Sequence, residues 1–434
     1  MLNFNTALFS PGDLDPSFNG GAPKTFNFFD GDTSHPRGVA VGQDGTIYMV
    51  GLGLVPGSDA TYYGIAAFEN DGTTSKEFNH GNILIDHFHS NLPGAQANNI
   101  SLIIDEQGNE KIFILGIAYV AKDNKLAKCP AMARYHLNGT PDKSFGSDGY
   151  SIIHPSFEDG KFTFSANAEA SWHISQQRIY IVTIRVGEDP RVSSVVVCTD
   201  LKGRLDNTFG SEGIAVIINP VFRQSTHLEN VYRIGNSIYL AGTASTHPYS
   251  AVAKLNLDGS IDREFGQQGF VVEQAYKADI NSIGEQQNGN LLCAGRLHPE
   301  QDPGWVLYQG VLRSFNATGG IDPEFNDGYP LFTQLGEATI WSSLIVQNDG
   351  RIVVSGIRNE KFPDLNYQYL LARFMPDGSF DSSFGRDGKG WIAFGRNPEV
   401  SDKITIAVQN DGAIIVAGST GFSESQAYIV RFKG

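Results

Sequence analysis

Sulfur-containing residues are few in this chain, with 3 cysteines and 4 methionines among 434 residues. Cys129, Cys198 and Cys293 lie far apart, and none of them belongs to a CxxC pair. This spacing indicates neither a disulfide framework nor a thiolate zinc site. We therefore expect buried or unreactive thiols, and we expect neither a metal nor another cofactor.

Positive charge is also scarce, because 32 Lys and Arg residues stand against 47 Asp and Glu residues, for a net charge of −15. Proteins that bind nucleic acids neutralise phosphates with a basic face, and no basic cluster is visible here. No stretch approaches the ~18 apolar residues of a membrane helix. The first residues lack the basic segment and apolar core of a secretory signal. We expect no nucleic-acid partner, no membrane insertion, and a protein that is cytoplasmic or secreted without a leader.

Glycine and aromatic residues are abundant, with 49 Gly, 28 Phe and 16 Tyr. Aromatic residues favour strands, and glycine favours turns. The composition therefore indicates an all-β chain with many turns.

One phrase recurs along the whole chain, for example as LDPSFNGG from Leu14 and FDSSFGRDG from Phe380. Its anchor is a phenylalanine at Phe18, Phe78, Phe145, Phe209, Phe265, Phe325 and Phe384. An aspartate stands three residues before the anchor in every copy except the second, which has Ser75. Ca²⁺ needs six to eight converging oxygens, and each copy offers mostly one carboxylate. We therefore interpret these aspartates as turn residues that accept backbone N–H groups.

A second regular element lies between the anchor phrases, as in RGVAVGQDGTIYMVG and SLIVQNDGRIVVSG. Asp-Gly between alternating apolar residues predicts a β-hairpin. A third strand precedes each anchor phrase and a fourth strand follows it. Seven units of four antiparallel strands predict an all-β, seven-bladed β-propeller.

The ends of the sequence complete this pattern, because the last unit, from about residue 400 to 434, contains only three strands. We expect Lys24–Phe29 to supply its outer strand, so that the N-terminal segment 1–30 pairs with the C-terminal blade 400–434. Asn3–Phe9 is a competing candidate for part of the third strand there. The whole chain, residues 1–434, is then a single propeller, which we expect to be a monomer.

The LDxxFGxxG phrases and the VQNDGxIIVAG hairpins closely resemble the delta-60 repeat family of bacterial β-propeller proteins. The resemblance spans nearly the whole chain. It implies a propeller fold, and it implies no particular activity because the family has no established common biochemistry.

Strand direction predicts which face of the propeller carries function. The short Asp-Gly and anchor turns share one face, and the longer, variable loops share the other face, where binding sites usually lie. Alignment of the inner hairpins predicts residues at the mouth of the central channel on that loop face: Arg37, Ile100, Glu169, Leu228, Asn281, Ser342 and Ile404, with His35, His227, Asp279, Asp402 and Lys403 nearby.

Aromatic residues near the variable loops suggest a binding surface, because exposed rings stack on sugars or anchor protein partners. We therefore predict a non-catalytic binding or scaffold propeller that recognises a protein or glycan through its loop face. The candidate binding residues are Arg37, Glu169, His227, Asn281, Asp402, Tyr62, Trp305 and Tyr367.

The alternative is a channel-centred hydrolase or lyase, with or without a metal, that uses Glu169, His35 or His227. No GxSxG motif for a catalytic serine occurs. His87 and His89 share one face of a strand and form the most metal-like string, but the sequence offers no third ligand. We therefore assign neither a catalytic residue nor a metal ligand from the sequence.

Overall fold

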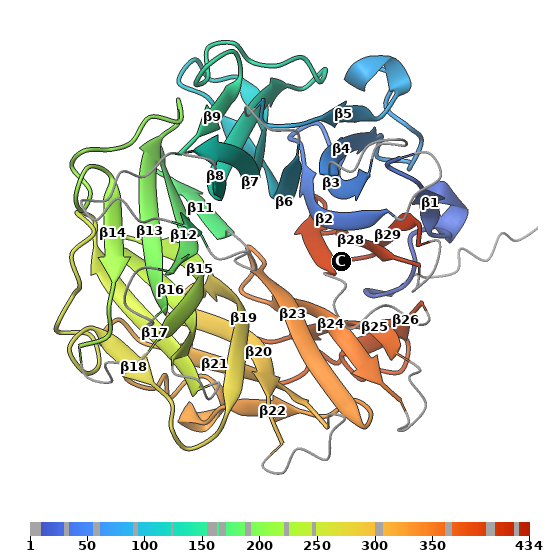
Figure 1. Ribbon diagram of the computed structural model, residues 1–434. Coiled ribbons are helices and arrows are strands. Elements are labelled where there is room, and N and C mark those ends of the chain that lie inside the picture. The colour runs from blue at the N-terminus through green and yellow to red at the C-terminus, as the bar shows by residue number, and fades with distance from the viewer. Residues whose placement is uncertain are drawn as a thin grey trace, which may run out of the picture.

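The computed structural model describes the parts of the chain that form the blades, together with short connections: residues 10–29, 34–54, 61–89, 94–122, 125–153, 163–164, 171–186, 192–220, 225–244, 249–299, 307–360, 367–395, 404–420 and 425–434. These residues form seven antiparallel sheets arranged around a central axis, and the chain passes once around the ring (Figure 1). The predicted seven-bladed β-propeller is confirmed. None of the described residues forms a helix long and apolar enough to cross a membrane.

The strands of each blade are paired in chain order from the axis outward, except at the closure. Blade 1 contains β2 (His35–Val41), β3 (Ile47–Leu54), β4 (Thr61–Phe68) and β5 (Leu84–Asp86). Blade 2 contains β6 (Ala95–Ile104), β7 (Glu110–Lys122), β8 (Lys125–His136) and β9 (Tyr150–Ile152). Blade 3 contains β11 (Ser171–Ser175), β12 (Arg178–Val186), β13 (Val192–Asp200) and β14 (Ile214–Ile217), and the short β10 (Thr163–Phe164) also pairs with β12.

The remaining blades follow the same order. Blade 4 contains β15 (Thr226–Ile234), β16 (Ser237–Ala244), β17 (Tyr249–Asn256) and β18 (Phe270–Val272). Blade 5 contains β19 (Ala278–Glu285), β20 (Leu291–Leu297), β21 (Gln309–Phe315) and β22 (Leu331–Thr333). Blade 6 contains β23 (Ala338–Val346), β24 (Ile352–Asn359), β25 (Tyr367–Phe374) and β26 (Trp391–Phe394). Blade 7 contains β27 (Thr405–Val408), β28 (Ile414–Ser419), β29 (Ala427–Phe432) and β1 (Lys24–Phe26). Three short 3₁₀ turns belong to anchor phrases: η1 (Asn19–Gly21), η2 (Phe78–Gly81) and η3 (Asn326–Gly328).

The ring closes where the two ends of the chain share blade 7. Strand β1 pairs with β29 in antiparallel register, with Lys24 opposite Ile429. Asp15 adds ion pairs to Arg431 at 3.1 Å and to Lys433 at 3.0 Å. The prediction that the N-terminal strand closes the last blade is confirmed, and the competing segment Asn3–Phe9 lies outside the described residues. Closure leaves no blade without a neighbour on either side.

Each anchor phenylalanine lies in a hydrophobic cluster between blades, and all seven are at most 1% exposed. The aspartate three residues earlier closes the turn, as at Asp142, where Oδ1 accepts the Ser144 N–H at 3.0 Å and the Ser144 hydroxyl at 2.7 Å. The turn interpretation of these aspartates is therefore correct.

In the anchor phrases of blades 2 and 6, the second oxygen of the aspartate contacts a buried arginine of the third strand, eight residues earlier. Arg134 Nε lies 2.9 Å from Asp142 Oδ2, and Arg373 Nε lies 2.7 Å from Asp381 Oδ2. Burial tends to raise the pKa of Asp142, but hydrogen bonds from Ser144 and the nearby charges of Arg134 and Lys111 hold it at about 2. In the second phrase Ser75 replaces the aspartate, and position 67 is an alanine. Both members of the ion pair are thus absent together, so no buried charge lacks its counterion.

Candidate functional site

Five of the innermost strands contain a β-bulge at the same level of the propeller. One residue of the inner strand has no partner on the second strand of its blade in β2, β6, β15, β19 and β23. A bulge inserts an unpaired residue and redirects its side chain. The bulge residues are Arg37, Asn98, Glu229, Asn281 and Ser342.

Glycines on the second strand make room for these bulges. A Cβ atom at Gly242 would lie 2.1 Å from the carbonyl oxygen of His227, and one at Gly295 would lie 1.9 Å from that of Asp279. Gly116 and Gly356 approach the inner strand equally closely. Only glycine tolerates such a contact, so in blades 2, 4, 5 and 6 a glycine within the second strand accompanies the bulge on the strand beside it.

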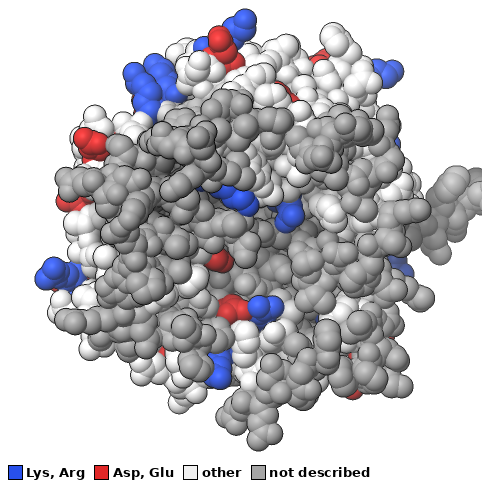
Figure 2. All heavy atoms as spheres, viewed as in Figure 1, with Lys and Arg blue, Asp and Glu red and all other residues white. Residues whose placement is uncertain are grey.

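All five bulge residues line one cavity of about 480 Å³ on the propeller axis, to which the inner strands of all seven blades contribute. The space-filling view shows a hollow at the middle of the face that is turned toward the viewer, with positive and negative side chains at its wall (Figure 2). Amides and hydroxyls dominate the remaining polar wall, with Asn99, Asn230, Ser282, Ser343 and Thr405 among its residues.

A second cavity of about 680 Å³ borders the first. Asn99, Trp172, His173 and Tyr232 line both cavities. The imidazole of His173 packs on the ring of Tyr232 with 4.1 Å between centroids. Burial, and then the charge of Arg233, lower the pKa of His173 to about 4. At neutral pH this imidazole is therefore uncharged.

Some of the cavity amides also connect neighbouring blades. Asn281 Nδ2 donates to the carbonyl oxygen of Trp341 at 2.7 Å, and Asn230 Nδ2 donates to that of Ile280 at 3.1 Å. These bonds fix the orientation of both amides at the cavity wall. Glu229, in contrast, has an exposed side chain at the bulge of β15.

A charged cluster of blade 5 supports the cavity wall at Arg296. Arg296 Nε donates to Asp279 Oδ2 at 2.7 Å, and His298 Nε2 lies 3.0 Å from the same oxygen. Burial tends to raise the pKa of Asp279, but His298 and Arg296 together hold it below its usual value. The Arg296 guanidinium also lies 4.6 Å from the centre of the Tyr308 ring. Arg296 is thus held in one orientation on the cavity wall.

The structure distributes the sequence-predicted binding residues over several places. Arg37 and Asn281 line the axial cavity. His227 lies on β15, two residues before Glu229, and burial lowers its pKa. Tyr62 lies on β4 and Tyr367 on β25, in the third strands of blades 1 and 6. Glu169, Asp402 and Trp305 lie outside the described residues. The binding roles of all eight residues stay predictions.

The alignment of the inner hairpins with one another missed two residues of the cavity. It expected Ile100 and Leu228 at the channel mouth, but both are buried in the cores of their blades. Asn98 and Glu229 take the equivalent places in the cavity wall. The alignment was made on the Asp-Gly turns, but inner hairpins differ in length, as the two-residue turn between Ile234 and Ser237 shows. The bulge glycines of the second strands would have given the correct register.

The histidine string after β5 shows no arrangement for a metal ion. No group of three or more His, Cys, Asp or Glu side chains suited to a metal occurs among the residues that the structure describes. His87 Nδ1 accepts the backbone N–H of His89 at 2.8 Å, so this nitrogen is already engaged.

The cysteines are buried free thiols. Burial raises the pKa of Cys198 and that of Cys293 to about 12, which makes both poor nucleophiles.

Comparisons with known proteins agree on the architecture. A family model described as a domain of unknown function (DUF5122) beta-propeller matches residues 236–265 and 347–384. No curated protein matches the chain in sequence. A protein of unknown function from Dyadobacter fermentans superposes with a TM-score of 0.46 at 11% identity, over 94% of this chain and 98% of that chain.

Two enzymes with a similar fold were also found. An α-L-arabinanase from Penicillium chrysogenum, complexed with arabinobiose, has a TM-score of 0.47 at 9% identity, over 95% of this chain and 99% of that chain. A sialidase from Streptococcus pneumoniae has a TM-score of 0.39 at 10% identity, over 95% of this chain and 71% of that chain. Similarities at this level show the fold alone.

These enzymes nevertheless correct the function predicted from sequence. The expectation of a non-catalytic binding or scaffold protein depended on the absence of a recognised catalytic motif. That premise is wrong, because an arabinanase and a sialidase superpose on this fold, so the fold and a missing motif do not indicate a non-catalytic protein. The physical reason is that a propeller brings polar side chains together from several blades, so a site on its axis leaves no contiguous motif. The matched segments of blades 4 and 6 support a β-propeller repeat family for this chain.

Proposed function

We propose that the protein is a hydrolase that acts on a carbohydrate in the axial cavity, with Glu229 as the residue that transfers the proton. The observation that carries this proposal is the ring of bulge residues, which brings the Glu229 carboxylate and the Arg37 guanidinium into a cavity whose wall also contains Arg296 and several amides and hydroxyls.

The cavity wall has the chemistry that sugar recognition requires. Hydroxyl groups of a sugar both donate and accept hydrogen bonds, and side-chain amides and hydroxyls do the same. Tyr232, which is partly exposed, adds aromatic surface on the same wall, against which the apolar face of a sugar ring can pack. Arg37 adds further hydrogen-bond donors to the lining of the cavity.

Hydrolysis of a glycosidic bond needs a proton at the leaving oxygen. The bond between the anomeric carbon and that oxygen breaks, and the oxygen of water forms a new bond to the same carbon. One proton of the water ends on the leaving group through the acid and base residues. Glu229 is suited to this transfer because its side chain is exposed within the cavity wall. Such enzymes generally use two carboxylates, and Glu169 stays our sequence-based candidate for the second.

The test is a hydrolysis assay with p-nitrophenyl glycosides and with soluble arabinan, xylan and mixed-linkage glucan. We expect Glu229→Gln to reduce the rate on the hydrolysed substrate by about 100-fold or more. Glu285→Gln is the matched control, because Glu285 lies exposed at the opposite end of the neighbouring inner strand, outside the lining of the cavity. The proposal is wrong if no glycoside is hydrolysed or if Glu229→Gln keeps the wild-type rate.

The finer family assignment is likewise a proposal. We infer that the chain belongs with the delta-60 repeat proteins, supported by the LDxxFGxxG phrases of the seven blades.

A further inference from the structure

Four aromatic side chains form a continuous series of ring contacts across the boundary between blades 1 and 2. The ring of Tyr62 on β4 lies 5.5 Å from His87, His87 lies 4.3 Å from His89, and His89 lies 4.2 Å from Tyr150 on β9. We call this set, Tyr62, His87, His89 and Tyr150, the ring ladder. Strands β5 and β9, which flank it, are the outermost strands of their blades, so the ladder lies at the rim, away from the axial cavity (Figure 1).

Asp86 holds the ladder in place. Its Oδ1 accepts the N–H of His87 at 2.7 Å and lies 3.1 Å from His89 Nε2. Its Oδ2 accepts the hydroxyl of Tyr150 at 2.6 Å and that of Tyr135 at 2.7 Å. The Asp86 side chain is 13% exposed, so these contacts form largely out of water.

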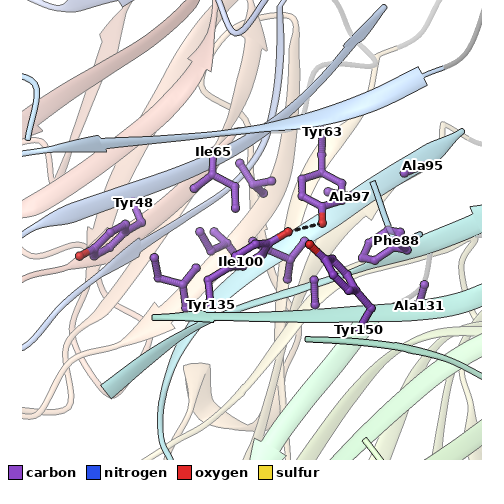
Figure 3. Close-up of a cluster of buried hydrophobic side chains, with 14 of the residues drawn as sticks. Tyr48, Tyr63, Ile65, Phe88, Ala95, Ala97, Ile100, Ala131, Tyr135 and Tyr150 are labelled. Carbon is purple, nitrogen blue, oxygen red and sulfur yellow. Dashed lines mark hydrogen bonds between the residues drawn. The ribbon is translucent and has the colours of Figure 1, made fainter. Parts of the chain in front are cut away.

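Buried tyrosines extend this network into the blade core. The hydroxyls of Tyr63 and Tyr135 lie 2.6 Å apart, and the hydroxyl of Tyr150 points toward them (Figure 3). Burial raises the pKa of Tyr63 and that of Tyr135 well above the usual value, so both stay protonated as donors. The ladder therefore has a rigid base.

The backbone at His89 is in the left-handed region. Its φ is +51°, a conformation that is uncommon for residues other than glycine but that histidine adopts more often than most. The imidazole lies over Tyr150, and His89 is the most exposed member of the ladder, with 53% of its side chain accessible.

The ring of His87 is a neutral surface as well as a hydrogen-bonding group. Burial, and then the nearby His89, lower the pKa of His87, so its ring is uncharged at neutral pH. No group of three or more metal-binding side chains occurs here among the described residues. An apolar or weakly polar ring can stack on an aromatic surface of this kind.

A groove of about 630 Å³ runs beside the ladder. His89, Tyr150 and Phe88 line one part of it, and the anchor phrase of blade 2 contributes Lys143 and Asp148. Ser147 of the same phrase also lines the groove. An ammonium, a carboxylate and a hydroxyl beside stacked rings together offer donors and acceptors around an aromatic surface.

We propose that the ring ladder and this groove bind sugar units of a polysaccharide chain, at a site separate from the axial cavity. A pyranose or furanose ring presents one apolar face, which packs on aromatic rings, and a rim of hydroxyls, which the flanking Lys143, Ser147 and Asp148 can bond. The site holds the chain without acting on it chemically, and its operation does not require the axial cavity to be catalytic.

The experiment is affinity electrophoresis of the full chain in native gels that contain soluble arabinan, xylan, mixed-linkage glucan or polygalacturonate. We expect at least one polysaccharide to retard the wild-type protein. His89→Ala, and separately Tyr62→Ala, should weaken that retardation by about tenfold in apparent affinity, because each removes a stacking ring. Tyr329→Ala is the matched control, since Tyr329 is 72% exposed in blade 5 and takes part in no such ladder.

The outcomes separate this proposal from the hydrolase. Retardation that is lost in His89→Ala but kept in Glu229→Gln supports the rim site whether or not hydrolysis occurs. A thermal melt of each variant checks that the propeller is folded, and Tyr62→Ala, which leaves the Asp86 network intact, serves if His89→Ala is unstable. The proposal is overturned if none of the four polysaccharides retards the wild-type protein, which would point to a protein partner instead, or if both ring variants are retarded like wild type.

Discussion

The anchor position and the bulge position both recur around the ring, but they use their residues in opposite ways. The anchor is phenylalanine in all seven phrases and is at most 1% exposed in each. The bulge carries Arg37, Asn98, Glu229, Asn281 and Ser342, which are four kinds of side chain in the five blades that share it. The anchor fills the same space between blades each time, so packing demands one shape. The bulge residue projects into a cavity. Its backbone geometry repeats from blade to blade, but its side chain can differ because it does not have to fill a fixed space.

The largest effect should come from the anchor. Phe145→Ala removes a ring that packs edge-on against Phe113 at 5.1 Å and lies beneath the Arg134 guanidinium. We expect a loss of about 4–5 kcal/mol in the free energy of unfolding, since the side chain is fully enclosed. Urea unfolding followed by fluorescence measures it, and Tyr329→Ala is the exposed control. A loss below about 1 kcal/mol would show that the anchor does not carry the packing assigned to it.

The ion pair behind the anchor should have the next largest effect. Arg373→Ala removes the nearer of the two cations from the buried carboxylate of Asp381 and leaves only Arg351, 3.5 Å from Oδ2, so we expect a loss of about 3 kcal/mol in the free energy of unfolding. The double variant Arg373→Ala with Asp381→Ser reproduces the natural pair of blade 1, Ala67 and Ser75. It should be more stable than Arg373→Ala alone. Equal or greater instability of the double variant would contradict the idea that the two positions are coupled.

Acid should weaken the same interaction in blade 2. The folded pKa of Asp142 is about 2, below the 3.8 of an aspartate in an unfolded chain. Its contribution is therefore fully present above about pH 4 and is lost as the pH falls toward 2. We expect this contribution to be about 2 kcal/mol, because each pKa unit corresponds to about 1.4 kcal/mol. Unfolding titrations between pH 5 and pH 2 should show a shallower loss of stability for Asp142→Asn than for wild type, and identical slopes would argue against it.

The smallest effect on stability should come from the bulge. Ser342→Ala removes a hydroxyl from the cavity wall and leaves the backbone unchanged, so the free energy of unfolding should change by less than about 0.5 kcal/mol. If Ser342→Ala alters hydrolysis or ligand binding in the cavity while the urea midpoint stays constant, the bulge residue acts in the cavity and not in packing between blades. A loss of several kcal/mol, as expected for Phe145→Ala, would mean that the two positions do not differ as described.

Local sequence patterns were sufficient for the fold because they report local geometry. The spacing of the phenylalanines, the Asp-Gly turns and the missing fourth strand of the last unit predicted the blades and their closure. To predict the residues of the site, the inner strands of different blades have to be aligned with one another. The position of a turn does not determine that alignment. The inner hairpins of blades 2 and 4 differ in length, and a bulge inserts one more residue, so alignment by turns placed Ile100 and Leu228 where Asn98 and Glu229 lie. The ring ladder was also missed, because ring contacts between β4 and β9 depend on the packing of two blades.

The pairing of β1 with β29 has a consequence for synthesis in the cell. The residues of β1 leave the ribosome early, and those of β29 emerge about 400 residues later, which is roughly 20–80 seconds at 5–20 residues per second. During that time blade 7 cannot form, and the first and sixth blades each present an uncovered side. The nascent chain is therefore most exposed to aggregation and to chaperones until its final residues appear, and a circular permutant that begins at β2 and places β1 after β29 should shorten that interval.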